Sequence, residues 1–150
     1  MLAALLALAG PACGEGTSPL SDLAPIPWSF VSHECGPSVL LTAGAVLGPP
    51  GARIGSMLPG RYAVRGAYDL TSAPLGRHTI SLGFNGFYVT RDSNRAGENR
   101  DAMVPAGVTT GRFEVVQEIL QWNSGPGMPI VWIYAGDTTG TALDCIEVHP

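Results

Sequence analysis

The chain has 150 residues, of which 45% are hydrophobic and 13% are charged, and its formal net charge is −4 at pH 7. A nucleic-acid-binding domain carries a clustered basic surface, so this acidic, charge-poor composition excludes nucleic acid as a partner. The apolar content is sufficient for a hydrophobic core, and the length fits a single domain.

The first residues have the pattern of an export signal. Leu2–Gly10 is an apolar run of about nine residues, which fits a signal-peptide core of roughly 7–15 and is too short to cross a bilayer. With the small residues that precede Cys13, it resembles a bacterial lipoprotein signal. The resemblance implies cleavage after residue 12, a lipidated Cys13 and a place in the outer membrane or at the cell surface. A cut after Ala9 would instead give a secreted or periplasmic protein, and a retained first helix is a third alternative.

The chain has three cysteines, Cys13, Cys35 and Cys145, and an odd number in an exported protein requires an explanation. If Cys13 carries the lipid, Cys35 and Cys145 remain to form a disulfide, which persists in an oxidising compartment. The alternative is a pair of buried, unpaired thiols.

The segment after Cys13 is rich in Gly, Pro and Ser and has neither helical nor strand periodicity. Such a composition is typical of a linker. We therefore expect a signal peptide at residues 1–12, a flexible tether at 13–30 and one domain at 31–150.

Frequent Gly and Pro leave little room for helices, and strand patterns recur instead. Residues 61–70 alternate between apolar and polar faces, as a half-buried strand does. Asn85-Gly86 predicts a hairpin turn, and 112–122 fits a helix or a strand, with the β-branched residues favouring the strand. The expected strands are 39–46, 61–70, 78–84, 87–90, 112–122, 129–135 and 142–149. They predict an all-β, two-sheet antiparallel β-sandwich of jelly-roll type.

The order of elements from Gly60 to the end suggests a family. The strands GRYAVRGAYDL and RHTISLGF are followed by a polar insertion, GRFEVVQEIL and the closing PIVWIYAGDTTGTALDCIEVHP. This order resembles the galactose-binding-like jelly rolls that include many carbohydrate-binding modules. The resemblance implies a sugar ligand, and it transfers no sugar-binding residue to this chain.

A polar loop offers a candidate Ca²⁺ site, because hard cations prefer grouped oxygen ligands. The candidate ligands are Asp92, Asn94, Glu98 and Asp101. The loop begins like an EF-hand and departs from it at positions five and twelve, so the alternative is a solvated loop without metal. We expect no other cofactor.

The other titratable groups do not have the spacing in the sequence that a catalytic site requires. His33, Glu34 and Cys35 are adjacent in sequence, and such a spacing rarely converges on one ion, although a Cys35–Cys145 disulfide would bring His149 near. Asp144 and Glu147 are three residues apart on one strand, so they are expected on opposite faces rather than as an acid pair. Asp144 is expected to accept hydrogen bonds from buried backbone donors.

Aromatic side chains are the remaining candidates for a binding site, because their flat apolar faces can stack on sugar rings. Trp122 precedes a Gly- and Pro-containing segment and is expected at a loop edge, and Tyr88 is a comparable candidate. Trp132 lies in an apolar run and is expected in the core.

These observations predict an exported, lipid-anchored, non-catalytic binding module at the bacterial cell envelope. Its expected partners are the membrane, through the anchor, and a glycan or an envelope protein. The alternative function is a structural or accessory subunit of an envelope assembly, because an unpaired edge strand can accept a strand from another chain.

Overall fold

The structure, a computed structural model, describes residues 20–90, 100–136 and 140–150. Its elements are a 3-10 turn, η1 (Leu20–Asp22), and the strands β1 (Ala24–Pro25), β2 (Phe30–His33), β3 (Leu41–Gly48), β4 (Gly60–Asp69), β5 (His78–Thr90), β6 (Arg100–Met103), β7 (Thr110–Ala135) and β8 (Ala142–His149). The described ranges contain no helix with the length and apolarity of a membrane span. The predicted all-β class is confirmed.

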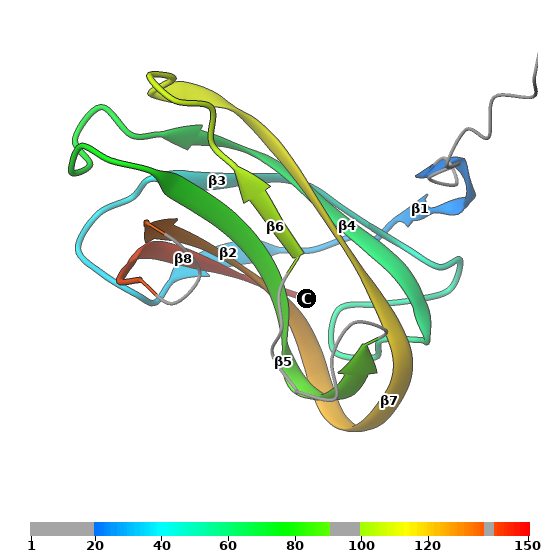
Figure 1. The fold of residues 1–150 in the computed structure, drawn as a ribbon. Helices are drawn as coiled ribbons and strands as arrows, with labels where there is room; N and C mark the ends of the chain where they lie inside the picture. Colours follow the sequence, from blue (N-terminus) through cyan, green and yellow to red (C-terminus); the bar gives the residue numbers. More distant parts are fainter. Residues whose placement is uncertain (1–19, 91–99, 137–139) are drawn as a thin grey trace, which may run out of the picture.

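The strands form two antiparallel layers that share β7 (Figure 1). The first half of β7 pairs with β4, which continues the order β1-β3-β4. The second half of β7 lies between β5 and β8, and β6 and β2 complete that layer at its two edges. A strand of 26 residues thus turns from one layer into the other, which confirms the predicted two-sheet sandwich.

Alternation along the strands builds the core between the layers. Tyr62, Val64 and Tyr68 of β4 are buried, as the sequence predicted. Ile80 and Leu82 of β5 face them from the other layer and are also buried. Since successive side chains of a strand point to opposite faces, Arg65, Ala67 and Asp69 of β4 lie on the exposed outer face.

The expected hairpin at Asn85-Gly86 is wrong, because β5 continues through it. The register passes from Asn85↔Met128 to Phe87↔Ser124, so one residue of β5 faces three of β7. Such a bulge bends a strand, and Gly and Pro are tolerated there. The Gly-Pro-Gly sequence at 125–127 therefore lies within a bent strand, where we had expected a loop.

The folded part begins before the expected boundary at residue 31. β1 pairs with the end of β3, and Ile26 is buried in the core, where its side chain and the ring of Tyr62 both border Gly48. Residues 24–26 therefore belong to the sandwich. A segment that contains Pro can form a short edge strand.

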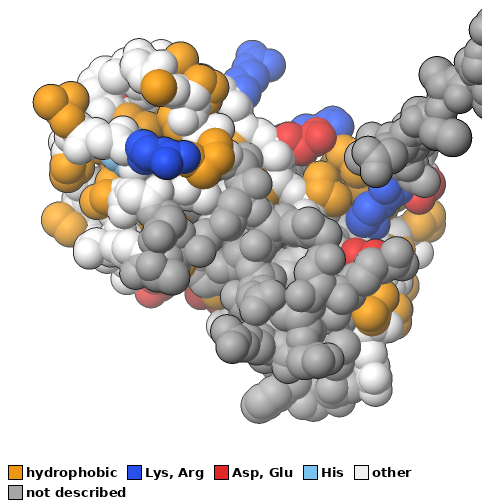
Figure 2. Space-filling view, viewed as in Figure 1, with side chains coloured by type: hydrophobic (Ala, Val, Ile, Leu, Met, Phe, Trp, Pro, Cys, Tyr) orange, Lys and Arg blue, Asp and Glu red, His pale blue; other side chains and the backbone are white. Residues whose placement is uncertain are grey.

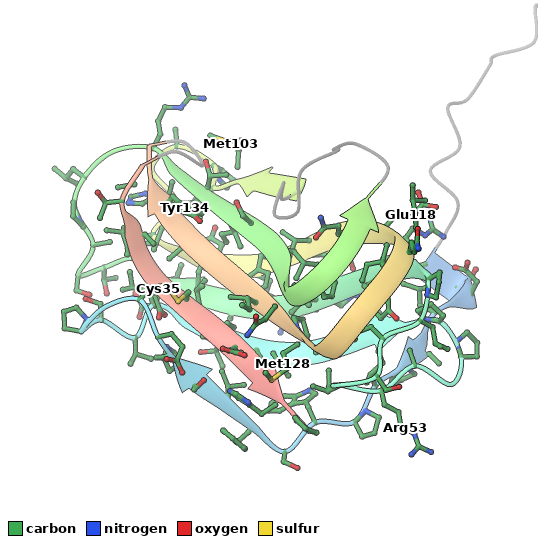
Figure 3. The ribbon with its side chains drawn as sticks, turned by 90° about the horizontal axis from the view of Figure 1, so that it is seen from below. Cys35, Arg53, Met103, Glu118, Met128 and Tyr134 are labelled. Carbon is green, nitrogen blue, oxygen red and sulfur yellow. A yellow bond between two sulfur atoms is a disulfide. The ribbon has the colours of Figure 1, made fainter. Side chains whose placement is uncertain are left out.

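The predicted disulfide is present. Cys35 and Cys145 are bonded with their Cα atoms 5.1 Å apart, and β2 pairs with β8 beside them. Figure 3 shows Cys35 where the segment after β2 meets β8. The bond therefore joins the first and last parts of the domain, as expected.

Candidate functional site

The best-formed candidate site is a pocket of about 610 Å³ at one end of the sandwich. Its two walls are the loop between β4 and β5 and the loop between β6 and β7, which Figure 1 shows at the same end of the molecule. Its volume is within the roughly 300–1,000 Å³ of small-molecule pockets. Its lining includes Leu70, Leu75, Arg77, His78, Met103, Val104 and Val108.

Hydrogen bonds fix the two loops that form this end pocket. The Leu70 amide donates to the Thr109 carbonyl at 2.6 Å, which ties one loop to the other. At the end of β4, the Asp69 carboxylate accepts from the Thr71 amide and hydroxyl, at 3.0 and 2.7 Å. These bonds lower the pKa of Asp69, the side-chain bond more than the backbone one. The β4–β5 loop thus begins with an Asx turn, which a carboxylate favours.

His78 is a buried polar residue in the lining of the end pocket. It shares the inward face of β5 with Ile80 and Leu82, and it is only 7% exposed. Its Nε2 atom is buried and has no hydrogen-bond partner among the described residues. A buried polar atom without a partner costs about 1–3 kcal/mol, so a ligand group that bonds to it would gain that energy.

The rim of the end pocket is apolar and exposed. Leu75 is fully exposed, and Met103 and Val108 are 50% and 40% exposed. Figure 2 shows hydrophobic side chains gathered at this end, with a basic side chain among them. Arg77 lines the same pocket, and no ion pair within the described ranges uses its charge.

A second hollow, of about 520 Å³, lies on β3, β4 and β7. Two of its charged lining residues, Arg65 and Glu114, neutralise each other in an ion pair across β4 and β7. Its floor includes glycines and small side chains rather than an unpartnered buried group. It is therefore a weaker candidate than the end pocket.

The aromatic candidates Tyr88 and Trp122 are directly opposed in the register of β5 and β7. Trp122 lies within β7 rather than at a loop edge, which corrects the expectation from sequence. The two positions, 34 residues apart in the chain, are brought together by the bent pairing of the two long strands.

The Ca²⁺ candidates Asp92, Asn94 and Glu98 lie outside the described residues, as does Cys13. Asp101 belongs to β6, where its backbone faces Ser81 of β5. The calcium site and the lipid attachment remain predictions.

Asp144 has the structural role that the sequence predicted. Its fully buried carboxylate accepts the backbone amides of Leu40 and Leu41, both at 2.8 Å, and contacts His33 Nδ1 at 2.9 Å. Glu147 is on the opposite face of β8 and receives the Asn85 amide at 3.3 Å. The two carboxyl groups therefore do not converge, as their spacing predicted.

Sequence reasoning did not identify the end pocket. Its walls come from two turns separated by a strand pair, and no spacing rule links them. One signal was present: His78 occupies an inward position of an alternating strand, where an apolar residue is usual.

Comparison with protein-family models, curated proteins and solved structures found no match to this chain. The likeness to galactose-binding-like domains therefore remains a prediction.

Proposed function

We propose that this chain is an exported, non-catalytic binding module of the bacterial cell envelope that takes its ligand into the end pocket. The observation that carries the proposal is the end pocket with His78 in its wall, a buried side chain whose Nε2 atom has no hydrogen-bond partner among the described residues. A binding role is favoured over catalysis because this nitrogen contacts no nucleophile or acid in the described part of the chain.

The lining indicates the chemistry of the ligand. Leu70, Val104 and Val108 are aliphatic, and no Phe, Tyr or Trp among the described residues lines the cavity. This surface suits an aliphatic body better than a sugar ring, which prefers an aromatic face. Arg77 at the pocket offers a charge-assisted hydrogen bond to a carboxylate. The ligand we propose is an amphiphile with an aliphatic body and an acidic end.

The envelope location is supported by the cysteines. Cys35 and Cys145 are bonded to each other, so Cys13 is the one remaining cysteine of the three. A lipid on Cys13 accounts for the odd number. The proposed anchor then leaves the sandwich at the membrane surface, where amphiphiles are found.

Binding of octanoate and decanoate, with the matching alcohols as uncharged probes, tests the ligand class by calorimetry on the full chain. We expect both acids to bind. Arg77→Gln should weaken acid binding by about 10- to 100-fold, since a bond to a charged group contributes roughly 1.5–3 kcal/mol. The same variant should leave binding of the alcohols unchanged, and His78→Phe should weaken both probe classes.

The matched control is Arg112→Gln, at the second hollow, which should have no effect. Failure of every acid and alcohol to bind would exclude the amphiphile proposal. An equal loss in Arg77→Gln and Arg112→Gln would show that the basic side chains act only through the overall charge.

A sugar ligand is the second candidate, supported by the opposed positions of Tyr88 and Trp122. A glycan array run on the same proteins separates the two. Glycan binding that is lost in Tyr88→Ala and Trp122→Ala, and kept in Arg77→Gln, would replace the end pocket with the aromatic pair.

A further inference from the structure

The ribbon formed by β2 and β8 carries a second group of polar side chains, remote in sequence from the end pocket. Phe30 pairs with His149 and Ser32 pairs with Glu147, so these four share the outer face of the ribbon. Glu34 follows on the same side, with its amide bonded to the Cys145 carbonyl at 3.1 Å.

Three of these groups can offer ligand atoms to one metal ion. One carboxylate oxygen of Glu34, one of Glu147 and one ring nitrogen of His149 all lie within 4.8 Å of one another. In a tetrahedral zinc site with ligand bonds of about 2.0–2.2 Å, the ligand atoms are about 3.3 Å apart. Small rotations of these side chains are enough to bring the ligand atoms from within 4.8 Å of one another to about 3.3 Å.

The charge at this group is unbalanced. Two carboxylates lie together, and neither forms an ion pair with a basic side chain within the described ranges. Like charges at such a separation repel, and a divalent cation would neutralise both.

The surroundings hold the ligands in place. The ring of His149 stacks on Phe30 with centroids 4.4 Å apart, and its Nε2 lies 2.8 Å from the Ser32 hydroxyl. The Asn85 amide donates to the Glu147 carboxylate at 3.3 Å, as outer partners of metal ligands do. The disulfide of Cys35, next to Glu34, fixes the two strands against each other. A site on rigid elements with supported ligands is pre-organised for binding.

We propose that Glu34, Glu147 and His149 bind a zinc-like divalent transition metal ion. The imidazole selects this class, because Ca²⁺ takes six to eight oxygen ligands and no nitrogen. Three protein ligands leave at least one position of the ion open to water or to a donor from another molecule.

Calorimetric titration with Zn²⁺, and in parallel with Ca²⁺, tests this site in the full chain carrying Cys13→Ser, so that no free thiol competes. We expect one zinc ion per chain and much weaker calcium binding. Glu147→Gln and His149→Gln should each lower zinc affinity at least about tenfold. Glu34→Gln, at an exposed position that cannot affect the core, should do the same.

Glu114→Gln is the matched control on the other layer and should bind zinc as the parent does. Absence of zinc binding, calcium binding as tight as zinc binding, or equal zinc affinity in the parent and all three ligand variants would each overturn the proposal. The acid-binding test of the end pocket uses different residues, so either proposal can fail without the other.

Discussion

Individual buried side chains hold separate segments of this sandwich together through hydrogen bonds. Asp144 is the clearest case, since one buried carboxylate satisfies two backbone amides of the segment that leads into β3. Such bonds are charge-assisted, so they are stronger than bonds between neutral groups. The role of Asp144 as a hydrogen-bond acceptor could be predicted from the sequence, because an acidic side chain on the apolar face of a strand requires hydrogen-bond donors. The donors themselves, more than 100 residues away, could not be predicted.

Tyr62 has a comparable role between β4 and the loop that precedes it. Its hydroxyl donates to the Leu58 carbonyl at 2.7 Å and accepts the Leu58 amide at 2.8 Å. Its ring lies against Gly48 so closely that a Cβ there would be 2.6 Å from a ring carbon. Glycine is required at that position because the ring occupies the space of a side chain.

Tyr62→Phe should keep the packing and remove both hydrogen bonds. Because the Leu58 amide and carbonyl would lose their partner, we expect the free energy of unfolding to fall by about 1–3 kcal/mol. Urea unfolding monitored by tryptophan fluorescence measures this change. An unchanged midpoint would mean that water replaces the hydroxyl without loss.

The same variant predicts a difference at high pH. Burial raises the pKa of Tyr62 above its ordinary value of 10.0, against a smaller opposing effect of the Leu58 hydrogen bond. The unfolded chain therefore loses this proton first, so the contribution of Tyr62 is complete below pH 10.0 and is lost as the pH rises through the folded-state pKa. The parent should lose more stability than Tyr62→Phe in that window.

At the scale of elements, the alternation of apolar and polar residues predicted burial correctly, whereas sequences with turn composition did not predict chain reversals correctly. Val64, Leu82 and Val148 lie in the core as the period-two pattern predicted. Asn85-Gly86 and the Gly-Pro-Gly of β7 have turn composition, and both lie inside paired strands. The residues that permit a reversal also permit a bulge, and only the partner strand decides between the two.

The disulfide acts on the pairing of β2 with β8, which joins elements at opposite ends of the chain. Its closed loop spans a sequence separation of 110 residues, so reduction releases a large conformational restriction in the unfolded chain. We expect reduction to lower the free energy of unfolding by about 2–5 kcal/mol.

Urea titrations with and without dithiothreitol measure this contribution. Cys13→Ser serves as the control, because it should respond to the reductant as the parent does. Coincident midpoints in the two conditions would show that β2 is held by backbone pairing alone.

Across the whole molecule, the end pocket and the start of the described chain lie far apart. Figure 1 shows η1 and β1 at one end of the sandwich and the β4–β5 and β6–β7 loops at the other. The register agrees, because β1 pairs with the end of β3 while the pocket follows the end of the antiparallel β4. A tether from Cys13 would therefore reach the sandwich at the end opposite the end pocket, so the anchor would leave the mouth of the pocket open to amphiphiles at the membrane surface.

The placement of the sandwich at the membrane surface depends on the anchor. The intact mass of the protein tests whether the anchor is present. The full chain, expressed from its own first residue in a Gram-negative host and measured without reductant, should have the mass of residues 13–150 with acyl groups added and two hydrogens lost to the disulfide. A mass that corresponds to residues 10–150 without acyl groups would mean that the protein is secreted and that Cys13 is a free thiol. The sandwich would then not be held at the membrane, and the ligand of the end pocket would have to be sought in solution rather than at the membrane surface.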